Sequence, residues 1–123
     1  MKPFDLRKMS VADLVDRFAA LGVGEFQAEL RGEIAKENRL LLQMRDVTEE
    51  LKRRPGDQRT ALLRLFDHPN VQVRLMAAKL TLAVAPAAAR QMLQDIEESK
   101  QYPQAGSAGM CLWALEQGIF KPT

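Results

Sequence analysis

The segment from Val71 to Ala85 constrains the fold of this chain most, because apolar residues lie on almost every side of it. On a helix, which turns about 100° per residue, these residues form two apolar stripes on opposite sides. One stripe consists of Val71, Leu75, Ala78, Leu82 and Ala85, and the other of Val73, Met76, Ala77, Leu80 and Val84. A helix that is apolar nearly all round must be covered on both flanks. The sequence therefore predicts a central helix over residues 71–85.

The rest of the chain also has helical periodicity, and no stretch alternates between apolar and polar residues as a half-buried strand does. Residues 1–9 are predicted to be a lead-in arm. Ser10 is a favourable N-cap for a first helix, and Gly22 is a favourable residue to end it. Residues 25–54 then predict one long helix, or two helices with a kink near Gly32. We expect an all-α fold of about five to six helices.

Turn residues divide the second half of the chain into two predicted helical hairpins. The first hairpin, residues 57–85, follows the turn Arg54-Pro55-Gly56-Asp57 and has its own corner at Asp67-His68-Pro69-Asn70, where Asn70 is predicted to cap the second helix. The second, residues 87–118, begins after Pro86 and stops at Gly118. Together with the N-terminal helices of residues 10–54, these hairpins predict a single domain over residues 1–123. The apolar pair Ile119 and Phe120 is expected to pack back onto it.

Residues 62–80 resemble a HEAT repeat. An apolar first helix ends at Asp67, a short turn follows, and Val73-Arg74 with Ala77-Ala78 opens the second helix. The second hairpin is degenerate, because Ala108-Gly109-Met110 stands where the double alanine would be. The whole chain, including the turn at 54–57 and the ending 118–123, is similar to a bacterial family of domains of unknown function. The resemblance implies a HEAT-like α-α superhelix.

Such an array implies a binding surface for another macromolecule rather than a reaction centre. The candidate partner-binding residues are Asn38, Arg39, Gln43, Gln72, Arg74, Lys79 and Trp113, with Ser107 and Met110 near the end of the chain. For three of these residues we favour a structural role. We expect Arg74 to pair with Asp67, Trp113 to lie in the core, and Lys79 to be solvated.

Catalytic and metal-binding patterns are sparse. One histidine and one cysteine leave no internal disulfide and no His/Cys metal site within one chain. Cys111 is predicted to lie in a helix and His68 in a turn, so a Cys/His dyad is disfavoured. We therefore expect no cofactor and no enzyme activity. An alternative is a carboxylate-based enzyme or ligand pocket at Glu33 and Glu37, which share one side of a helix.

Charge is unevenly distributed along the chain. The net charge is only +2, but residues 31–85 hold eleven Lys or Arg against seven acids. The densest basic cluster is Lys52, Arg53, Arg54 and Arg59, and at a helix C-terminus such residues complement the macrodipole. We favour that interpretation, and keep nucleic-acid binding through the basic middle segment as an alternative.

The sequence predicts a small, non-catalytic protein-binding module. One form of it is an immunity- or antitoxin-type partner that occludes a toxin domain. The amino end lacks the apolar core of a signal peptide, and no apolar stretch approaches the roughly 20 residues of a membrane span. These features predict a cytoplasmic protein that does not insert into membranes, and they leave its oligomeric state open.

Overall fold

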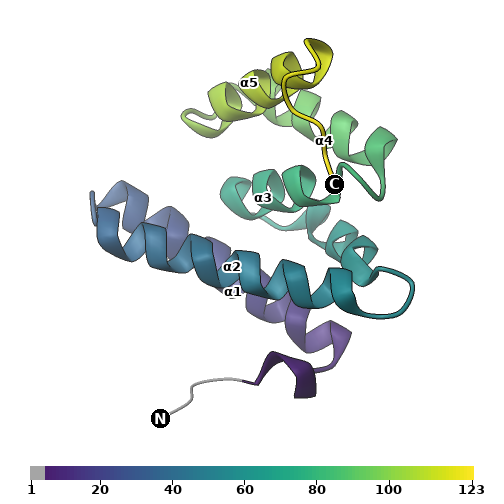
Figure 1. The fold of residues 1–123 in the computed structure, drawn as a ribbon. Helices are drawn as coiled ribbons and strands as arrows, with labels where there is room; N and C mark the ends of the chain where they lie inside the picture. Colours follow the sequence, from purple (N-terminus) through teal and green to yellow (C-terminus); the bar gives the residue numbers. More distant parts are fainter. Residues whose placement is uncertain (1–4) are drawn as a thin grey trace. The chain divides into compact units, whose positions relative to one another are not determined.

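The computed structural model describes residues 5–123, and every regular element in that range is helical, so the all-α prediction is confirmed (Figure 1). Two short segments are 3-10 helices, η1 (Leu6–Lys8) and η2 (Gln58–Asp67). The α-helices are α1 (Val11–Leu30), α2 (Ile34–Arg53), α3 (Val71–Thr81), α4 (Pro86–Ser99) and α5 (Gln104–Glu116). No helix in the described range is both long and apolar enough to cross a membrane.

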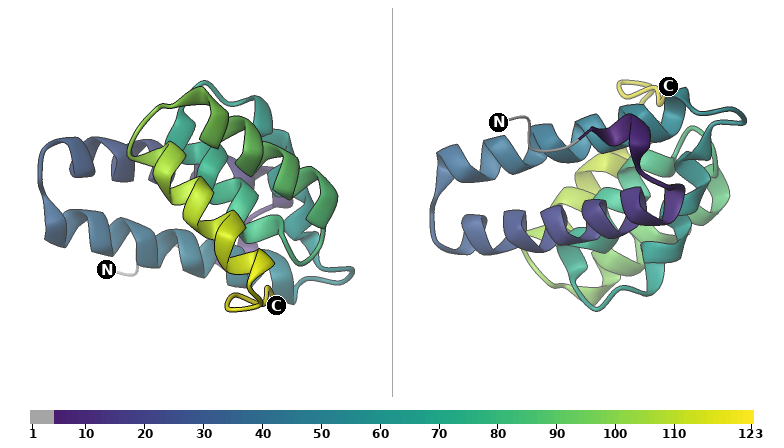
Figure 2. Two further views of the ribbon diagram at one scale, coloured as in Figure 1. Left: turned by 90° about the horizontal axis from the view of Figure 1, so that it is seen from above. Right: turned by 90° about the horizontal axis from the view of Figure 1, so that it is seen from below.

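The chain forms two compact units, of which the first ends at Ala61 and the second spans Leu62–Thr123. In the first unit, α1 and α2 lie side by side as a helical hairpin (Figure 2). Their buried apolar residues recur every three or four positions, as expected for amphipathic helices. These residues are Leu14, Val15, Phe18, Leu21, Ala28, Met44, Val47 and Leu51.

The first helix does not end at Gly22, contrary to the sequence prediction. It begins at the predicted N-cap, Ser10, and continues to Leu30. The break comes at Gly32, whose φ of +68° places it in the left-handed region that suits glycine. A glycine inside a helix costs only about 1 kcal/mol relative to alanine, which burial of neighbouring side chains offsets. Gly22 therefore lies within α1. The 25–54 stretch is divided at Gly32, as the two-helix alternative predicted, and its second helix begins at Ile34.

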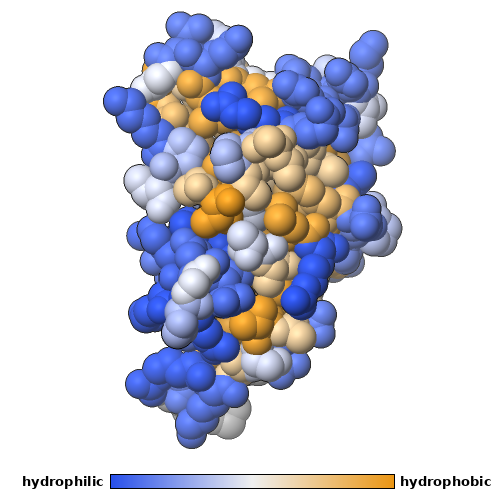
Figure 3. Space-filling model, turned by 90° about the vertical axis from the view of Figure 1, so that its right-hand side faces the viewer, coloured by the Kyte–Doolittle hydropathy of each residue, from blue (hydrophilic) through white to orange (hydrophobic). Residues whose placement is uncertain are grey.

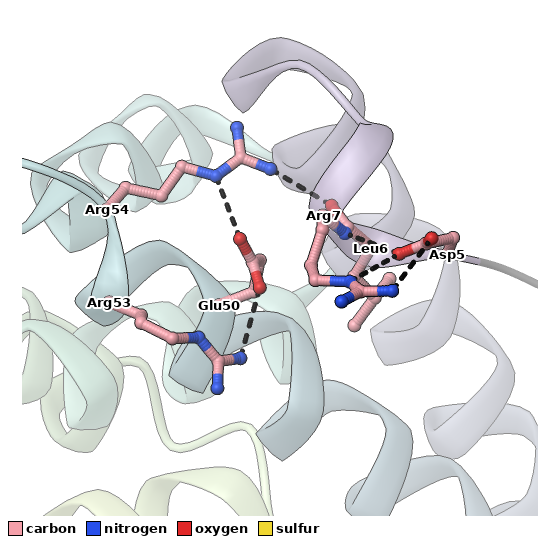
Figure 4. A network of polar contacts seen from close by, with 6 residues as sticks. All are labelled: Asp5, Leu6, Arg7, Glu50, Arg53 and Arg54. Carbon is pink, nitrogen blue, oxygen red and sulfur yellow. Dashed lines mark hydrogen bonds and ion pairs between the residues drawn. The ribbon is translucent and has the colours of Figure 1, made fainter.

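Residues 1–4 of the predicted arm lie outside the described residues, and the remainder is attached to the first unit. The Asp5 side chain accepts a hydrogen bond from the Arg7 backbone N–H, which caps η1. The Arg54 guanidinium, at the end of α2, donates to the Leu6 carbonyl at 2.9 Å (Figure 4). The arm is thus fixed to the C-terminal end of α2.

In the second unit, α3 packs against α4 and α5, and α4 and α5 pack on each other (Figure 2). Asn70 caps α3 as predicted, because its Oδ1 accepts from the Gln72 and Val73 amides at 2.9 and 3.2 Å. Pro86 begins α4, also as predicted. The helix α3 is shorter than expected, since it ends at Thr81, whose hydroxyl donates to the Ala77 carbonyl.

The two apolar stripes of the 71–85 segment are buried to different extents. The first stripe is buried except for Ala85, whereas the second has Val73 and Ala77 buried and Met76, Leu80 and Val84 half-buried. The prediction of a covered helix is therefore confirmed for the first stripe and only in part for the second. The segment before it differs from the prediction, because residues 58–67 form a 3-10 helix rather than an α-helix. Asp57 precedes it with a φ of +50°, and its carboxylate binds the Arg59 side chain at 2.7 Å.

Candidate interaction surface

The predicted partner-binding residues divide between the two units. In the first unit, Asn38 and Arg39 are exposed on α2, and Gln43 is half-buried. The Gln43 side-chain oxygen accepts a hydrogen bond from Arg17 of α1 at 3.3 Å, so this residue joins the two helices of the hairpin. The remaining candidates, Gln72, Arg74, Lys79 and Trp113, belong to the second unit.

Gln72 and Lys79 make internal contacts rather than facing solvent freely. Gln72 is only 6 % exposed, and its side-chain oxygen accepts from the Gln104 amide at 3.1 Å. Lys79 is half-buried, and its ammonium donates to the Ser107 hydroxyl at 2.7 Å. The expectation that Lys79 is solvated is therefore wrong. Both residues tie α3 to α5, and we interpret them as positioning α5.

The expected ion pair between Arg74 and Asp67 is not formed among the described residues. Asp67 is exposed at the end of η2. Arg74 instead lines a cavity of about 160 Å³, and its Nε is buried without a hydrogen-bond partner in the described part of the chain. The other lining residues come from α4 and the turn after it: Met92, Asp95, Ile96, Ser99 and Gln101.

Trp113 is half exposed, at 50 %, so the expectation that it lies in the core is wrong. On the same outer side of α5 lie Met110, which is 65 % exposed, and the exposed Gly106. Their spacing of four and then three residues places them on one helical stripe. The expectation for Trp113 came from its size, because a large aromatic residue at helical spacing is more often part of the core. Small residues occupy the buried side, including Ala105 and Ala108.

Further exposed apolar residues flank α5 in the sequence. Tyr102, before the helix, is 70 % exposed, and Ile119 and Phe120, after it, are 67 % and 39 % exposed. The backbone of these last two residues does turn back, since both amides donate to the Ala114 carbonyl, but their side chains remain accessible. We define the α5 surface as Tyr102, Gly106, Met110, Trp113, Ile119 and Phe120. Figure 3 shows from one side how exposed hydrophobic residues interrupt the hydrophilic surface.

The basic cluster around the end of α2 is largely neutralised by neighbouring acids. Glu50 pairs with Arg53 and with Arg54, at 3.0 Å in each case (Figure 4). The hydrogen bond from Arg54, supported by that from Arg53, holds the pKa of the Glu50 carboxyl below its ordinary value. Arg59 pairs with Asp57 at 2.7 Å. Three of the four cluster cations thus already have an anionic partner.

Glu37 of the predicted carboxylate pair lies in a cluster with Glu25 and Glu29 of α1. Carboxylate oxygens of Glu25, Glu29 and Glu37 lie within 4.8 Å of one another, and Glu25 is 1 % exposed. Glu33 is exposed and lies 3.9 Å from Arg31. Burial, followed by the nearby Glu37 charge, raises the pKa of the Glu29 carboxyl. Carboxylates this close repel one another unless a proton or a cation lies between them.

Cys111 is half-buried on α5. Burial raises the pKa of its thiol, and the more distant charges of Lys79 and Arg90 only partly offset this effect. A neutral thiol is a poor nucleophile, because the thiolate is the reactive form. The environment of Cys111 is therefore that of a packed side chain.

Comparison with known proteins places the chain in a family. The family described as "Domain of unknown function (DUF2019)" matches residues 12–116. The chain belongs to the DUF2019 family. That range contains Tyr102, Gly106, Met110 and Trp113 of the α5 surface, whereas Ile119 and Phe120 follow it. The predicted similarity to a family of domains of unknown function is thereby confirmed.

A solved structure similar to this DUF2019 protein is the crystal structure of the protein RPA1889 from Rhodopseudomonas palustris CGA009. The two chains are 55% identical and superpose with a TM-score of 0.95. The match covers 98% of this chain and 100% of that chain. A search of curated proteins gives no significant match.

Proposed function

We propose that this DUF2019 protein is a non-catalytic, HEAT-like module that binds another protein. The helical pairs support the HEAT-like interpretation. A tight corner at residues 68–70 joins η2 to α3, and α4 and α5 form the following pair, against which α3 packs. Stacked helical pairs of this kind expose extended surfaces that bind partners through many contacts.

The observation that carries the proposal is the exposure of Trp113 beside Met110 on the outer side of α5. A helix on the surface of a soluble protein normally carries polar residues on its outer side, and α5 lies at the surface of its unit. Its outer stripe is apolar instead, which is the property of a surface that another protein covers. Tryptophan and methionine are both enriched at protein interfaces, and tryptophan is prominent among residues whose truncation costs most binding energy.

One form of this function is that of an immunity- or antitoxin-type protein whose partner is a toxin domain. An exposed apolar stripe suits such a role, because occluding a cleft requires contact area and no chemistry. The α5 stripe is nearly uncharged, so we expect its affinity to depend only weakly on salt.

Binding of nucleic acid through the basic middle segment is the weaker alternative. Arg53, Arg54 and Arg59 would have to leave Glu50 and Asp57 in order to contact phosphates. Titration of labelled DNA or RNA at two salt concentrations tests this alternative, because phosphate contacts weaken steeply as salt rises. We expect no binding at physiological salt.

Affinity capture from the native host tests the proposed function. The full chain should retain a protein that the Trp113→Ala variant loses, with affinity reduced by roughly 30-fold or more. Leu42→Ala is the matched control, because Leu42 is an exposed apolar residue on α2. This variant should bind the partner as the wild type does. Recovery of no protein that depends on Trp113 would contradict the proposal.

A further inference from the structure

We propose that the α5 surface is a two-fold interface between two copies of this chain. The inference rests on the proposed function and names the partner that occupies the surface. A two-fold interface uses the same surface on both copies, so that surface must be complementary to itself. The shape and the charge of the α5 surface meet this requirement, and its area is large enough for a specific contact.

Gly106 and Trp113 lie on either side of Met110, and this placement makes the shape of the surface complementary to itself. Gly106 lies four residues before Met110 and Trp113 three residues after it, which is about one helical turn in each direction. If two α5 helices pack antiparallel with their axis of symmetry near Met110, Trp113 of each copy lies opposite Gly106 of the other. The largest side chain of the stripe then meets the position that has no side chain.

The surroundings of Gly106 suit an indole ring. A Cβ placed at Gly106 would meet only ring carbons of Tyr102, at 3.7 and 3.9 Å. The space above the glycine is therefore open, with an aromatic ring at its edge. A Trp113 side chain from the second copy could fill this space and contact Tyr102 through its ring, an arrangement that aromatic pairs favour.

The charged residues next to the two ends of α5, Lys100 and Glu116, favour the antiparallel arrangement. Glu116 lies at the C-terminal end of α5, and Lys100 precedes the helix at its N-terminal end. Antiparallel packing brings Glu116 of one copy to the end where Lys100 of the other copy lies. It also opposes the two helix dipoles, which is the favourable orientation. Parallel packing would instead place like charges together.

The available area is sufficient for a weak, specific dimer. The five side chains of the α5 surface are between 39 % and 70 % exposed, and a buried aromatic residue covers about 150–250 Å². If all five side chains are covered, the apolar contribution is on the order of 500 Å² per copy, or about 1,000 Å² for the dimer. That total reaches the lower limit of specific interfaces, so we expect a dissociation constant in the micromolar range.

Sedimentation equilibrium of the full chain, from micromolar to millimolar concentration, measures this association directly. We expect a reversible monomer–dimer equilibrium that Trp113→Ala weakens by roughly 30-fold or more. Leu42→Ala should leave the equilibrium unchanged, and thermal melts should show that both variants fold. A wild-type chain that stays monomeric throughout this range overturns the inference, as does a dimer that Trp113→Ala leaves intact.

A charge-reversal cycle tests the orientation of the two helices. Lys100→Glu and Glu116→Lys should each weaken the dimer several-fold, because each change places like charges at the same end. The double variant should restore the association, which a merely structural role of either residue would not produce. Single variants without effect, or no recovery in the double variant, would overturn the antiparallel arrangement.

A cysteine placed at the symmetry axis gives an independent readout. The Met110→Cys variant, in a Cys111→Ser background, should form an intermolecular disulfide under mild oxidation, because residue 110 lies near its own copy across the axis. The same cysteine placed at Leu42 should not. Absence of a crosslink at position 110 would overturn the proposed axis.

Failure of this inference differs from failure of the proposed function. If the chain is monomeric but captures an unlike protein in a Trp113-dependent manner, the second copy is not the partner and the protein-binding function stands. If the chain is monomeric and captures nothing through Trp113, both proposals are wrong.

Discussion

Arg54 donates a hydrogen bond from Nε to Glu50 Oε2 at 3.0 Å, while its Nη2 holds the Leu6 carbonyl at 2.9 Å. The side chain of Glu50 is only 8 % exposed, so its charge depends on Arg54 and Arg53 for compensation. The last turn of α2 and the N-terminal segment therefore share one polar network (Figure 4). Loss of the Glu50 charge should therefore weaken the contact between the last turn of α2 and the N-terminal segment.

The Glu50→Gln substitution should destabilise the protein by about 1–3 kcal/mol at neutral pH, because it removes a charged acceptor from two arginines. The pKa of Glu50 is lowered in the folded state, so its contribution to stability is present above the ordinary value of 4.5. That contribution is lost as the pH falls through the lowered, folded-state pKa. Urea unfolding at neutral and acidic pH measures the difference in free energy of unfolding between the wild type and the variant. This difference should be smaller at acidic pH.

Glu49→Gln is the control for this prediction. Glu49 is the neighbouring residue on α2 and is exposed, so the same change should alter the free energy of unfolding by less than about 0.5 kcal/mol. Equal losses for the two variants would show that the network at Glu50 does not stabilise the fold.

The Asn70→Ala substitution should cost about 1 kcal/mol, because it leaves two amides of the first turn of α3 without their acceptor. Denaturant unfolding gives the value. The same substitution at Asn38, exposed within α2, should be neutral or stabilising, since alanine has the higher helix propensity. If Asn38→Ala destabilises as much as Asn70→Ala, the capping interaction is not the cause.

The Glu29→Gln substitution should stabilise the protein at neutral pH and raise its melting temperature. Burial and Glu37 raise the pKa of Glu29 in the folded state. A raised pKa means that stability is greatest below the ordinary value of 4.5 and is lost as the pH rises through the folded-state pKa. The variant should therefore differ most from the wild type near pH 7 and least near pH 4.

Glu33→Gln serves as its control, because the contact between Glu33 and Arg31 is exposed and 3.9 Å long. Thermal melts across this pH range should superpose for Glu33→Gln and the wild type. A destabilised Glu29→Gln variant at pH 7 would contradict the prediction that these carboxylates repel one another.

Much of the fold could be predicted where local chemistry decides it. Asn70 and Pro86 begin helices because an amide side chain can accept from free backbone amides and because proline fits the first helical turn. Gly22 misled the prediction, because a glycine that packs inside a helix and one that ends it look alike in sequence. The tertiary packing along α1 decides between these two cases, and a single sequence does not reveal that packing.

The candidate site was harder to predict, because it depends on which side of an apolar helix faces outward. Periodicity marks a face only when polar residues mark the opposite one, and α5 has almost none. Trp113 was named as a candidate but expected in the core, because a large aromatic residue at helical spacing is more often buried. The Arg74 expectation failed for a different reason, since a repeat pattern suggests an ion-pair partner but does not fix the geometry between two helices.

Arg74→Met should be neutral or stabilising. The Nε of Arg74 is buried without a hydrogen-bond partner among the described residues, and methionine keeps most of the apolar stem while removing the charge. Arg54→Met is the matched substitution, and it should cost about 2 kcal/mol because it breaks the contacts to Glu50 and Leu6. Urea unfolding of both variants checks the contrast. A larger loss for Arg74→Met would indicate that its guanidinium is satisfied after all.

Gly24→Ala and Gly32→Ala should change stability in opposite directions. Gly24 lies inside α1, and an added Cβ would meet its nearest neighbour, Leu40 Cδ1, at 3.4 Å, so the substitution should stabilise by up to about 1 kcal/mol. Gly32 has a φ of +68° and nothing within 4 Å of an added Cβ, so only backbone strain acts there, and alanine should cost about 1 kcal/mol. Thermal and urea unfolding measure both changes. If Gly24→Ala proves the more destabilising, the first helix ends near that glycine and not at Leu30.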